Sequence, residues 1–231
     1  MLLFDMAGRL IAPSRLLKTV GGDIDRHGIA AGVTIPTTGD YSGVTVTDTP
    51  ADTSLSKTLT RTAAGKAAVI GSVFKARGDL MAARLVGFVS GGGSGATSGF
   101  TRRDFTYGFR TTNSSDGCYI EYRNPDTSTP GIFLTVKKGS SIVRTPINLQ
   151  TNNPEERYCL SFWISKNKST GGWVATLGEG DQIRTVLEIS QSDEDFDNKF
   201  FEPFIEWDWT YASGNFAPQV SHLSHEAYYL F

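Results

Sequence analysis

The feature that most limits the fold of this chain is a succession of short segments of alternating polarity, which begins near residue 56 and continues to the C-terminus. In the segment 158–165, the even positions are Tyr, Leu, Phe and Ile, whereas the odd positions include Cys, Ser and Trp. A period of two is typical of a strand with one buried face. The sequence therefore predicts an all-β fold, an antiparallel two-sheet sandwich of the jelly-roll type. The other predicted strands are 66–75, 83–90, 105–110, 118–122, 132–136, 142–148, 173–177, 184–189, 204–209 and 226–231.

Length and composition exclude several classes of protein. The chain has 231 residues, enough for one large sandwich whose core needs no disulfide. Its formal net charge of −2 gives no electrostatic reason to expect a nucleic-acid partner. No apolar run approaches the roughly 18 residues that a membrane-spanning helix requires, so we expect no membrane insertion. Cys118 and Cys159 both fall in predicted strands, and we expect both to be free thiols.

The first 60 residues have a different pattern from the rest of the chain. Their apolar residues follow neither a helical nor a strand period, and Gly8 and Pro13 interrupt any long helix. We therefore divide the chain into an N-terminal arm or attachment segment, 1–60, and a jelly-roll sandwich, 61–231. Two interpretations of the first segment stay open: an extended arm that becomes ordered against a neighbouring subunit, and an ordinary strand-and-loop opening to the same sandwich. The start of the chain lacks the basic and apolar regions of a signal peptide, so we expect synthesis in the cytoplasm.

The order of several segments resembles a known family. Tyr-Gly-Phe-Arg (107–110) is followed by Asn-Ser-Ser-Asp-Gly-Cys-Tyr-Ile-Glu-Tyr (113–122), Gly-Ile-Phe-Leu-Thr-Val (131–136), a Thr-Pro strand and Glu-Arg-Tyr-Cys-Leu-Ser-Phe-Trp-Ile (156–164). This order is similar to concanavalin-like lectin and laminin-G-like sandwiches, in particular to those in structural proteins of tailed bacteriophages. The resemblance covers residues 65–231. It implies a concanavalin-like jelly roll in a virion protein that is made in the host cytoplasm.

The resemblance leads to a main functional hypothesis and two alternatives. The main hypothesis is a non-enzymatic bacteriophage virion structural protein, either a capsid-decorating protein or a tail or fibre component. We expect it to contact other virion proteins and to form a homo-oligomer, with a trimer favoured. The first alternative is a carbohydrate-binding lectin module that binds a receptor glycan on the cell surface. The second alternative is a glycoside hydrolase, since the same sandwich carries many functions.

The acidic residues of one predicted strand weigh against the hydrolase. Some glycoside hydrolases with this sandwich carry three acids as Glu-x-Asp-x-(x)-Glu, and Glu206 and Asp208 begin that pattern. Thr210 and Tyr211 stand where the third acid belongs. A retaining mechanism needs two carboxyl groups about 5 Å apart with separate roles. We therefore expect that the protein is not an enzyme.

The same strand contains three aromatic residues that could bind a sugar. Trp207 and Trp209 alternate with the acids, and Tyr211 follows on the same side. Their rings would stack on sugar rings if this side of the strand faced solvent. Aromatic residues at alternate positions also fill the cores of sandwiches, and this is the competing interpretation.

Two groups of potential metal ligands remain. Asp193, Asp195 and Asp197 occupy alternate positions, as oxygen ligands do in many calcium loops, and calcium is the one cofactor that the sequence suggests. A solvated acidic turn is the alternative, because the glycine and the closing glutamate of such loops are missing. His222 and His225 would share a face only on a helix, whereas the surrounding pattern predicts a strand, so we expect no zinc site.

Overall fold

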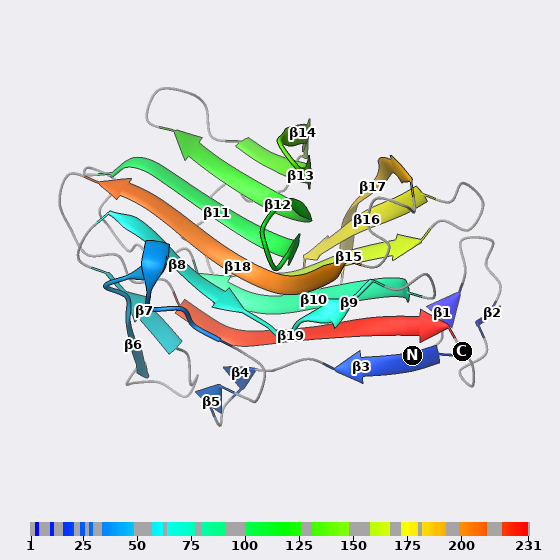
Figure 1. The fold of residues 1–231 in the computed structure, drawn as a ribbon, viewed down its shortest axis with the longest axis horizontal. Helices are drawn as coiled ribbons and strands as arrows, with labels where there is room; N and C mark the ends of the chain where they lie inside the picture. The colour runs from blue at the N-terminus through cyan, green and yellow to red at the C-terminus, as the bar shows by residue number, and fades with distance from the viewer. Residues whose placement is uncertain are drawn as a thin grey trace.

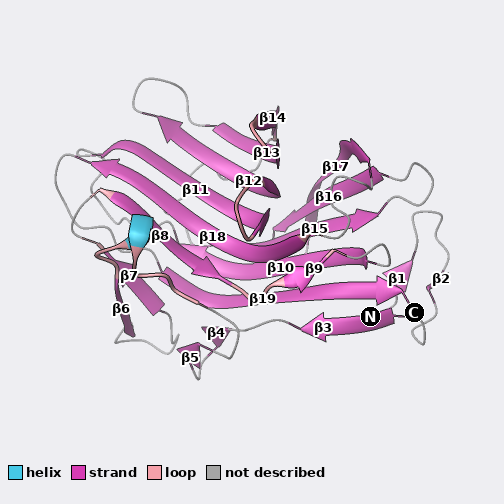
Figure 2. Ribbon diagram, in the orientation of Figure 1, coloured by secondary structure: helices cyan, strands magenta, loops and turns pink. Residues whose placement is uncertain are grey.

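The fold is a sandwich built almost wholly from strands. The computed structural model describes residues 3–4, 10–11, 16–20, 24–25, 28–29, 34–48, 57–61, 64–76, 80–90, 100–125, 131–147, 158–166, 172–179, 182–192, 199–211 and 219–230. Within these ranges the chain forms β1 to β19 and one 3-10 helix, η2 (Gly39–Tyr41). The strands belong to a seven-stranded sheet, a ten-stranded sheet and the small pair β1 (Leu3–Phe4) and β2 (Leu10–Ile11) (Figures 1 and 2).

Most of the seven-stranded sheet occupies the upper left part of Figure 1. Strand β11 pairs with β12 on one side and with β18 on the other, and every pairing in this sheet is antiparallel. The order is β14 (Ser141–Pro146), β13 (Gly131–Lys138), β12 (Asp116–Pro125), β11 (Phe100–Thr111), β18 (Phe200–Tyr211) and β8 (Gly65–Ile70), with β9 (Phe74–Lys75) also paired to β18.

The ten-stranded sheet is centred on the last strand of the chain. Its order is β17 (Gln182–Ser192), β16 (Gly172–Glu179), β15 (Tyr158–Lys166), β10 (Leu80–Ser90) and β19 (Gln219–Leu230). The far edge of β19 pairs with β3 (Leu16–Val20), β4 (Ile24–Asp25) and β7 (Lys57–Thr60). Strand β4 also pairs with β5 (Gly28–Ile29), and β7 also pairs with β6 (Thr45–Asp48).

Strands β3 to β7 of the first 60 residues therefore extend the ten-stranded sheet of the same chain, whereas β1 and β2 pair only with each other. Three of them pair with successive parts of β19: β3 beside Glu226–Leu230, β4 beside Leu223, and β7 beside Gln219 and Val220. In addition, Thr34 forms a bridge to Ile70 at the end of β8. Contact of this segment with a neighbouring subunit stays a prediction.

The core lies between the two large sheets and follows from the alternation of the strands. On β11, Phe105, Tyr107 and Phe109 are buried, whereas the intervening positions face outward. On β15, the side chains of Phe162 and Ile164 are buried, as the pattern predicted. Burial of each such ring or aliphatic chain contributes roughly 2 kcal/mol. The rings of Phe109 and Phe162 meet across the core with centroids 6.0 Å apart.

Polar groups also join the two layers. The Tyr107 hydroxyl donates a hydrogen bond of 3.0 Å to the Leu85 carbonyl on β10, which satisfies a buried polar group. These observations confirm the predicted all-β, antiparallel two-sheet sandwich.

The thiol of Cys118 is buried and free, and its burial raises its pKa, whereas the side chain of Cys159 lies outside those described. In the described part of the chain, no helix is long and apolar enough to cross a membrane.

Candidate functional site

A polar groove of about 370 Å³ lies on the outer face of the seven-stranded sheet. It is lined by outward-facing side chains of β8, β18, β11, β12 and β13, and by the 3-10 helix η2. The alternation that buries Phe105 and Tyr107 turns Asp104 and Thr106 to this outer face. The groove is therefore the reverse side of the core-forming strands.

Two aromatic rings from β12 and β18 contact each other in the floor of the groove, because the residue between them on β11 is a glycine with no side chain. Gly108 lies directly opposite Tyr119 on β12 and Phe204 on β18. The two rings reach across Gly108 and pack edge to face with centroids 5.7 Å apart. A Cβ on Gly108 would lie 2.6 Å from the Tyr119 Cβ and from the Cys118 carbonyl oxygen, so a larger residue does not fit. Phe204 is buried, whereas Tyr119 is half-buried beside the opening.

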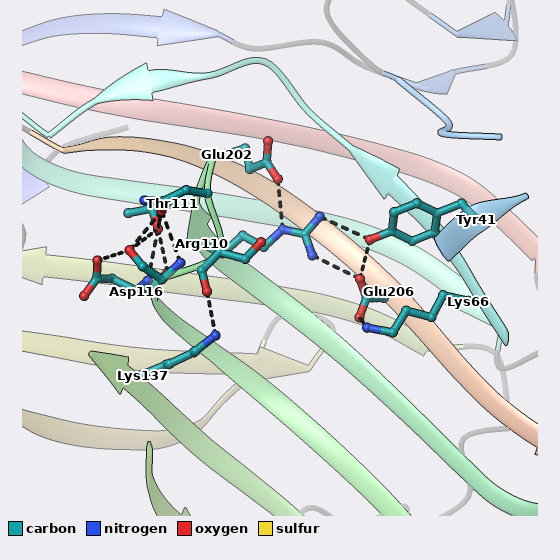
Figure 3. Close-up of polar contacts among 11 residues, drawn as sticks. Tyr41, Lys66, Arg110, Thr111, Asp116, Lys137, Glu202 and Glu206 are labelled. Carbon is teal, nitrogen blue, oxygen red and sulfur yellow. Dashed lines mark hydrogen bonds and ion pairs between the residues drawn. The ribbon is translucent and has the colours of Figure 1, made fainter. Parts of the chain in front are cut away.

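Arg110 forms the centre of a charged cluster at one end of these rings (Figure 3). Its Nε donates to Glu202 Oε1 at 2.9 Å and its Nη1 to Glu206 Oε2 at 3.0 Å. Its guanidinium carbon lies 4.3 Å from the centroid of the Phe204 ring, which is a cation–π contact. Arg110 thus covers the ring and links two carboxylates of β18.

Glu206 receives two further donors from outside β11. The Tyr41 hydroxyl donates to Glu206 Oε2 at 2.6 Å, and Lys66 Nζ lies 3.2 Å from Glu206 Oε1 (Figure 3). Burial alone would raise the pKa of Glu206. The charge of Lys66 and the hydrogen bond from Tyr41 help to outweigh burial, and the net pKa lies below its usual range. Burial and the adjacent Glu206 raise the pKa of Tyr41 to about 12, so its hydroxyl stays a donor at neutral pH.

A second carboxylate, Glu121, lies on the opposite side of β11. It accepts hydrogen bonds from Thr135 Oγ1 at 2.9 Å and from Arg144 Nε at 2.7 Å. Glu121 and Glu206 both lie directly opposite Thr106, one on each neighbouring strand. The groove is therefore bordered on both sides by carboxylates that are held by cations.

The turn between β11 and β12 closes one end of the groove. The Thr111 hydroxyl donates to Asn113 Oδ1 at 2.7 Å and accepts from the Asp116 amide at 3.0 Å. Ser114 adopts a φ of 55°, and its carbonyl accepts a hydrogen bond of 2.6 Å from Lys137 (Figure 3). This network fixes the turn that precedes Tyr119.

The residues that the sequence suggested for sugar binding are placed differently. Trp207 is 1% exposed and packs against Phe105 with ring centroids 5.7 Å apart, so the suggested sugar contact is wrong for Trp207 and the core interpretation is correct. Burial of this ring removes both of its faces from any ligand. Trp209 and Tyr211 lie in β18, but their side chains are not among those described. Their role stays a prediction.

The acidic residues can be placed in part. Glu206 and Asp208 project to the side opposite Trp207, as the alternation predicted, and both line the groove. Asp193, Asp195 and Asp197 lie outside the described residues, so calcium binding there stays a prediction. Among the residues that are described, no three His, Cys, Asp or Glu side chains are grouped as metal ligands.

Most of the groove was not recognised in the sequence. Arg110, Tyr119 and Glu121 stand in segments that marked the fold, yet none of them carries a motif of its own. Tyr41 lies 165 positions from its partner Glu206, and only the folded chain brings them together. One usable signal was alternation, because the residues between buried aromatic positions must face outward.

Comparison with known proteins identifies the fold. No family model and no curated protein matches the sequence. Among solved structures, a peanut lectin with a nine-residue peptide is 10% identical, with a TM-score of 0.56, and the match covers 94% of this chain and 98% of that one. The carbohydrate recognition domain of Emp47p is 9% identical, with a TM-score of 0.57, over 95% of this chain and 99% of that domain.

A bacteriophage module has the same architecture. The CBM2 module of the evolved Dit of Lactobacillus casei BL23 phage J-1 is 12% identical, with a TM-score of 0.56, over 92% of this chain and 97% of the module. At such low identity these likenesses show the fold alone. The sandwich is a lectin-type, concanavalin-like jelly roll, as the resemblance in the sequence predicted.

Proposed function

We propose that this chain is a carbohydrate-binding module and that the groove on the seven-stranded sheet is its binding face. The observation that carries the proposal is the groove itself, in which charged and hydroxyl side chains surround the paired rings of Tyr119 and Phe204. Its volume of about 370 Å³ is within the range of small-ligand sites. The lectin-type fold supports the same conclusion by analogy.

The chemistry of the groove suits a sugar. A sugar hydroxyl both donates and accepts hydrogen bonds, so it can donate to Glu206 while it accepts from Arg110 or Lys66. Hydrogen bonds to charged partners are stronger than neutral ones. The half-buried Tyr119 ring offers an apolar surface for the C–H face of a sugar ring beside these polar groups.

The same geometry favours binding without cleavage. Glycoside hydrolysis requires one carboxylic acid that is protonated near neutral pH, which means a raised pKa. Lys66 and Arg110 contact Glu206, and its pKa is lowered rather than raised. We therefore propose that Glu206 is not the acid of a glycosidase, which agrees with the expectation that the protein is not an enzyme.

Structures with the same fold provide supporting analogies. One solved neighbour is a winged bean acidic lectin in complex with methyl-α-D-galactose, which has a TM-score of 0.54 and 9% identity to this chain. The Emp47p domain is described as a carbohydrate recognition domain, and the phage J-1 module as a CBM2 module. These descriptions apply to those proteins, and the proposal for this chain rests on its own groove.

A glycan array followed by titration calorimetry tests the proposal. Changing Tyr119 to Ala should weaken the best glycan about tenfold, because the loss of stacking corresponds to about 1.4 kcal/mol. Phe200→Ala is the matched control, since Phe200 is an exposed aromatic residue at the start of β18 and does not line the groove. Circular dichroism would establish that both variants fold. Failure of every glycan to bind, or full affinity in the folded Tyr119→Ala variant, would refute the proposal.

A second proposal concerns where the module acts. We propose that it belongs to a bacteriophage virion, as a capsid-decorating, tail or fibre component that forms a homo-oligomer. The likeness to the phage J-1 module supports this context, together with the resemblance in the sequence. Cosedimentation of the purified protein with empty capsids or tails is expected. Its absence, with a monodisperse monomer in light scattering at micromolar concentration, would count against both parts.

A further inference from the structure

The cations on the β8 side of the groove are already bound to carboxylates of the protein. Arg110 donates to Glu202 at 2.9 Å and to Glu206 at 3.0 Å. Lys66 lies 3.2 Å from the other oxygen of Glu206. An anionic ligand that approached these cations would therefore also approach the protein carboxylates that already neutralise them.

Two cations on the opposite side are also bound to carboxylates. Arg144 donates to Glu121 at 2.7 Å, and Lys199 lies 3.2 Å from Asp116. Neither Arg144 nor Lys199 lines the groove, so they approach these carboxylates from outside it. Lys137 donates to a main-chain carbonyl at 2.6 Å. On this side, a ligand in the groove therefore meets Glu121 and Asp116 before it meets their counter-ions, whereas Lys137 lines the groove itself.

Further carboxylates line the groove between these two sides. Asp104 on β11 and Asp208 on β18 occupy directly opposed positions, and both line the groove. Asp40 of η2 adds another carboxylate to the lining. Arg123 lies 4.0 Å from Asp104 without lining the groove, and the six carboxylates of the described lining outnumber its three cations. This excess of negative charge repels an anionic ligand.

From this arrangement we infer that the groove selects glycans without anionic groups and excludes carboxylated, sulfated or phosphorylated ones. The inference rests on the proposed function and names its ligand class. A hydroxyl can donate to a groove carboxylate and accept from Arg110 without breaking any ion pair. A carboxylate or sulfate on the ligand has no proton to donate, and it would face Asp104 and Asp208 directly. Exclusion therefore follows from the charge of the ligand and not from its size.

Matched glycans that differ only in charge provide the test. Suitable probes are oligogalacturonates and the same chains as methyl esters, and sialyllactose beside its own methyl ester, on one array with calorimetry of the best pair. The neutral member of a pair should bind at least about tenfold more tightly, and the difference should narrow between about 0.05 M and 0.5 M salt. The Asp40→Asn change should reduce the difference in affinity between the neutral and the anionic glycan by about threefold, because it removes one negative charge from the lining and keeps the size of the side chain.

The outcomes separate the inference from the proposed function. Equal binding of both members of each pair, or preference for the anionic one, would overturn charge selection and leave carbohydrate binding intact. An unchanged difference in Asp40→Asn and at high salt would also overturn it, because selection would then not be electrostatic. If no glycan on the array bound, neutral or anionic, the proposed function itself would fail.

Discussion

Replacement of Arg110 by Met should destabilise the sandwich by about 3 kcal/mol, because it removes one partner of a mostly buried charge cluster. The side chains of Arg110, Glu202 and Glu206 are only 12%, 13% and 13% exposed, so solvent does little to replace the lost cation. The cation–π contact with Phe204 is lost as well. Glu206 keeps Lys66, which places the cost at the lower end of the range for broken buried pairs.

Urea unfolding of a set of variants measures this cost. In the Arg110→Met background, adding Glu202→Gln and Glu206→Gln should recover about 2 kcal/mol, because neutral amides no longer need the cation. The pKa of Glu206 is lowered from an ordinary value of 4.5, so its contribution is present above that pH and is lost as pH falls through the folded value. The penalty of Arg110→Met should therefore shrink at acid pH. This account of the cluster would be refuted if Arg110→Met were as stable as the parent protein, or if the triple variant were no more stable than Arg110→Met alone.

Three further predictions concern the fold beneath the groove. Gly108→Ala should lower the free energy of unfolding in urea by about 2 kcal/mol, because the new Cβ would clash with Tyr119. Gly139 has a positive φ but an open environment, so Gly139→Ala should lower it by only about 1 kcal/mol. Equal losses of stability in the two variants would contradict the close-approach argument. Burial lowers the pKa of His225 from 6.5 to about 4, so the free energy of unfolding should fall by about 2 kcal/mol as the pH decreases from 6.5 to 4.5. A His225→Leu variant with the same dependence of stability on pH would exclude His225 as the cause. Trp207→Phe should lower the free energy of unfolding by about 2 kcal/mol and leave glycan affinity within about twofold by calorimetry, whereas a large loss of affinity in the folded variant would return Trp207 to the binding site.

The sequence predicted the architecture well because strand alternation is a local property. The side chains of Phe162 and Ile164 are buried, as their period of two required, and Glu206 projects away from Trp207 for the same reason. Alternation divides a strand into two faces, but it does not say which face a second sheet will cover. This is why the Trp207 ring suited both a sugar site and a core until the partner sheet was known.

The groove could not be predicted because it depends on register between strands that are distant in the sequence. Thr106 lies between Glu121 and Glu206 only because β11 pairs with β12 on one side and with β18 on the other. A shift of one residue in either pairing would move a carboxylate to the opposite face. Gly108 allows Tyr119 and Phe204 to meet, and that role also follows only from the pairing.

The position of Tyr41 connects the two segments into which the sequence divided the chain. A boundary at residue 60 would assign Tyr41 to the N-terminal arm and its partner Glu206 to the sandwich. Yet the Tyr41 hydroxyl donates to Glu206 at 2.6 Å, and Arg61 holds the same segment through the Asp40 carbonyl at 3.3 Å. The wall of the groove on the β8 side is therefore complete only when residues 39–41 are docked. Any contact that drew this segment onto another subunit would remove Tyr41 from Glu206, so assembly through the arm and ligand binding in the groove would compete for the same residues.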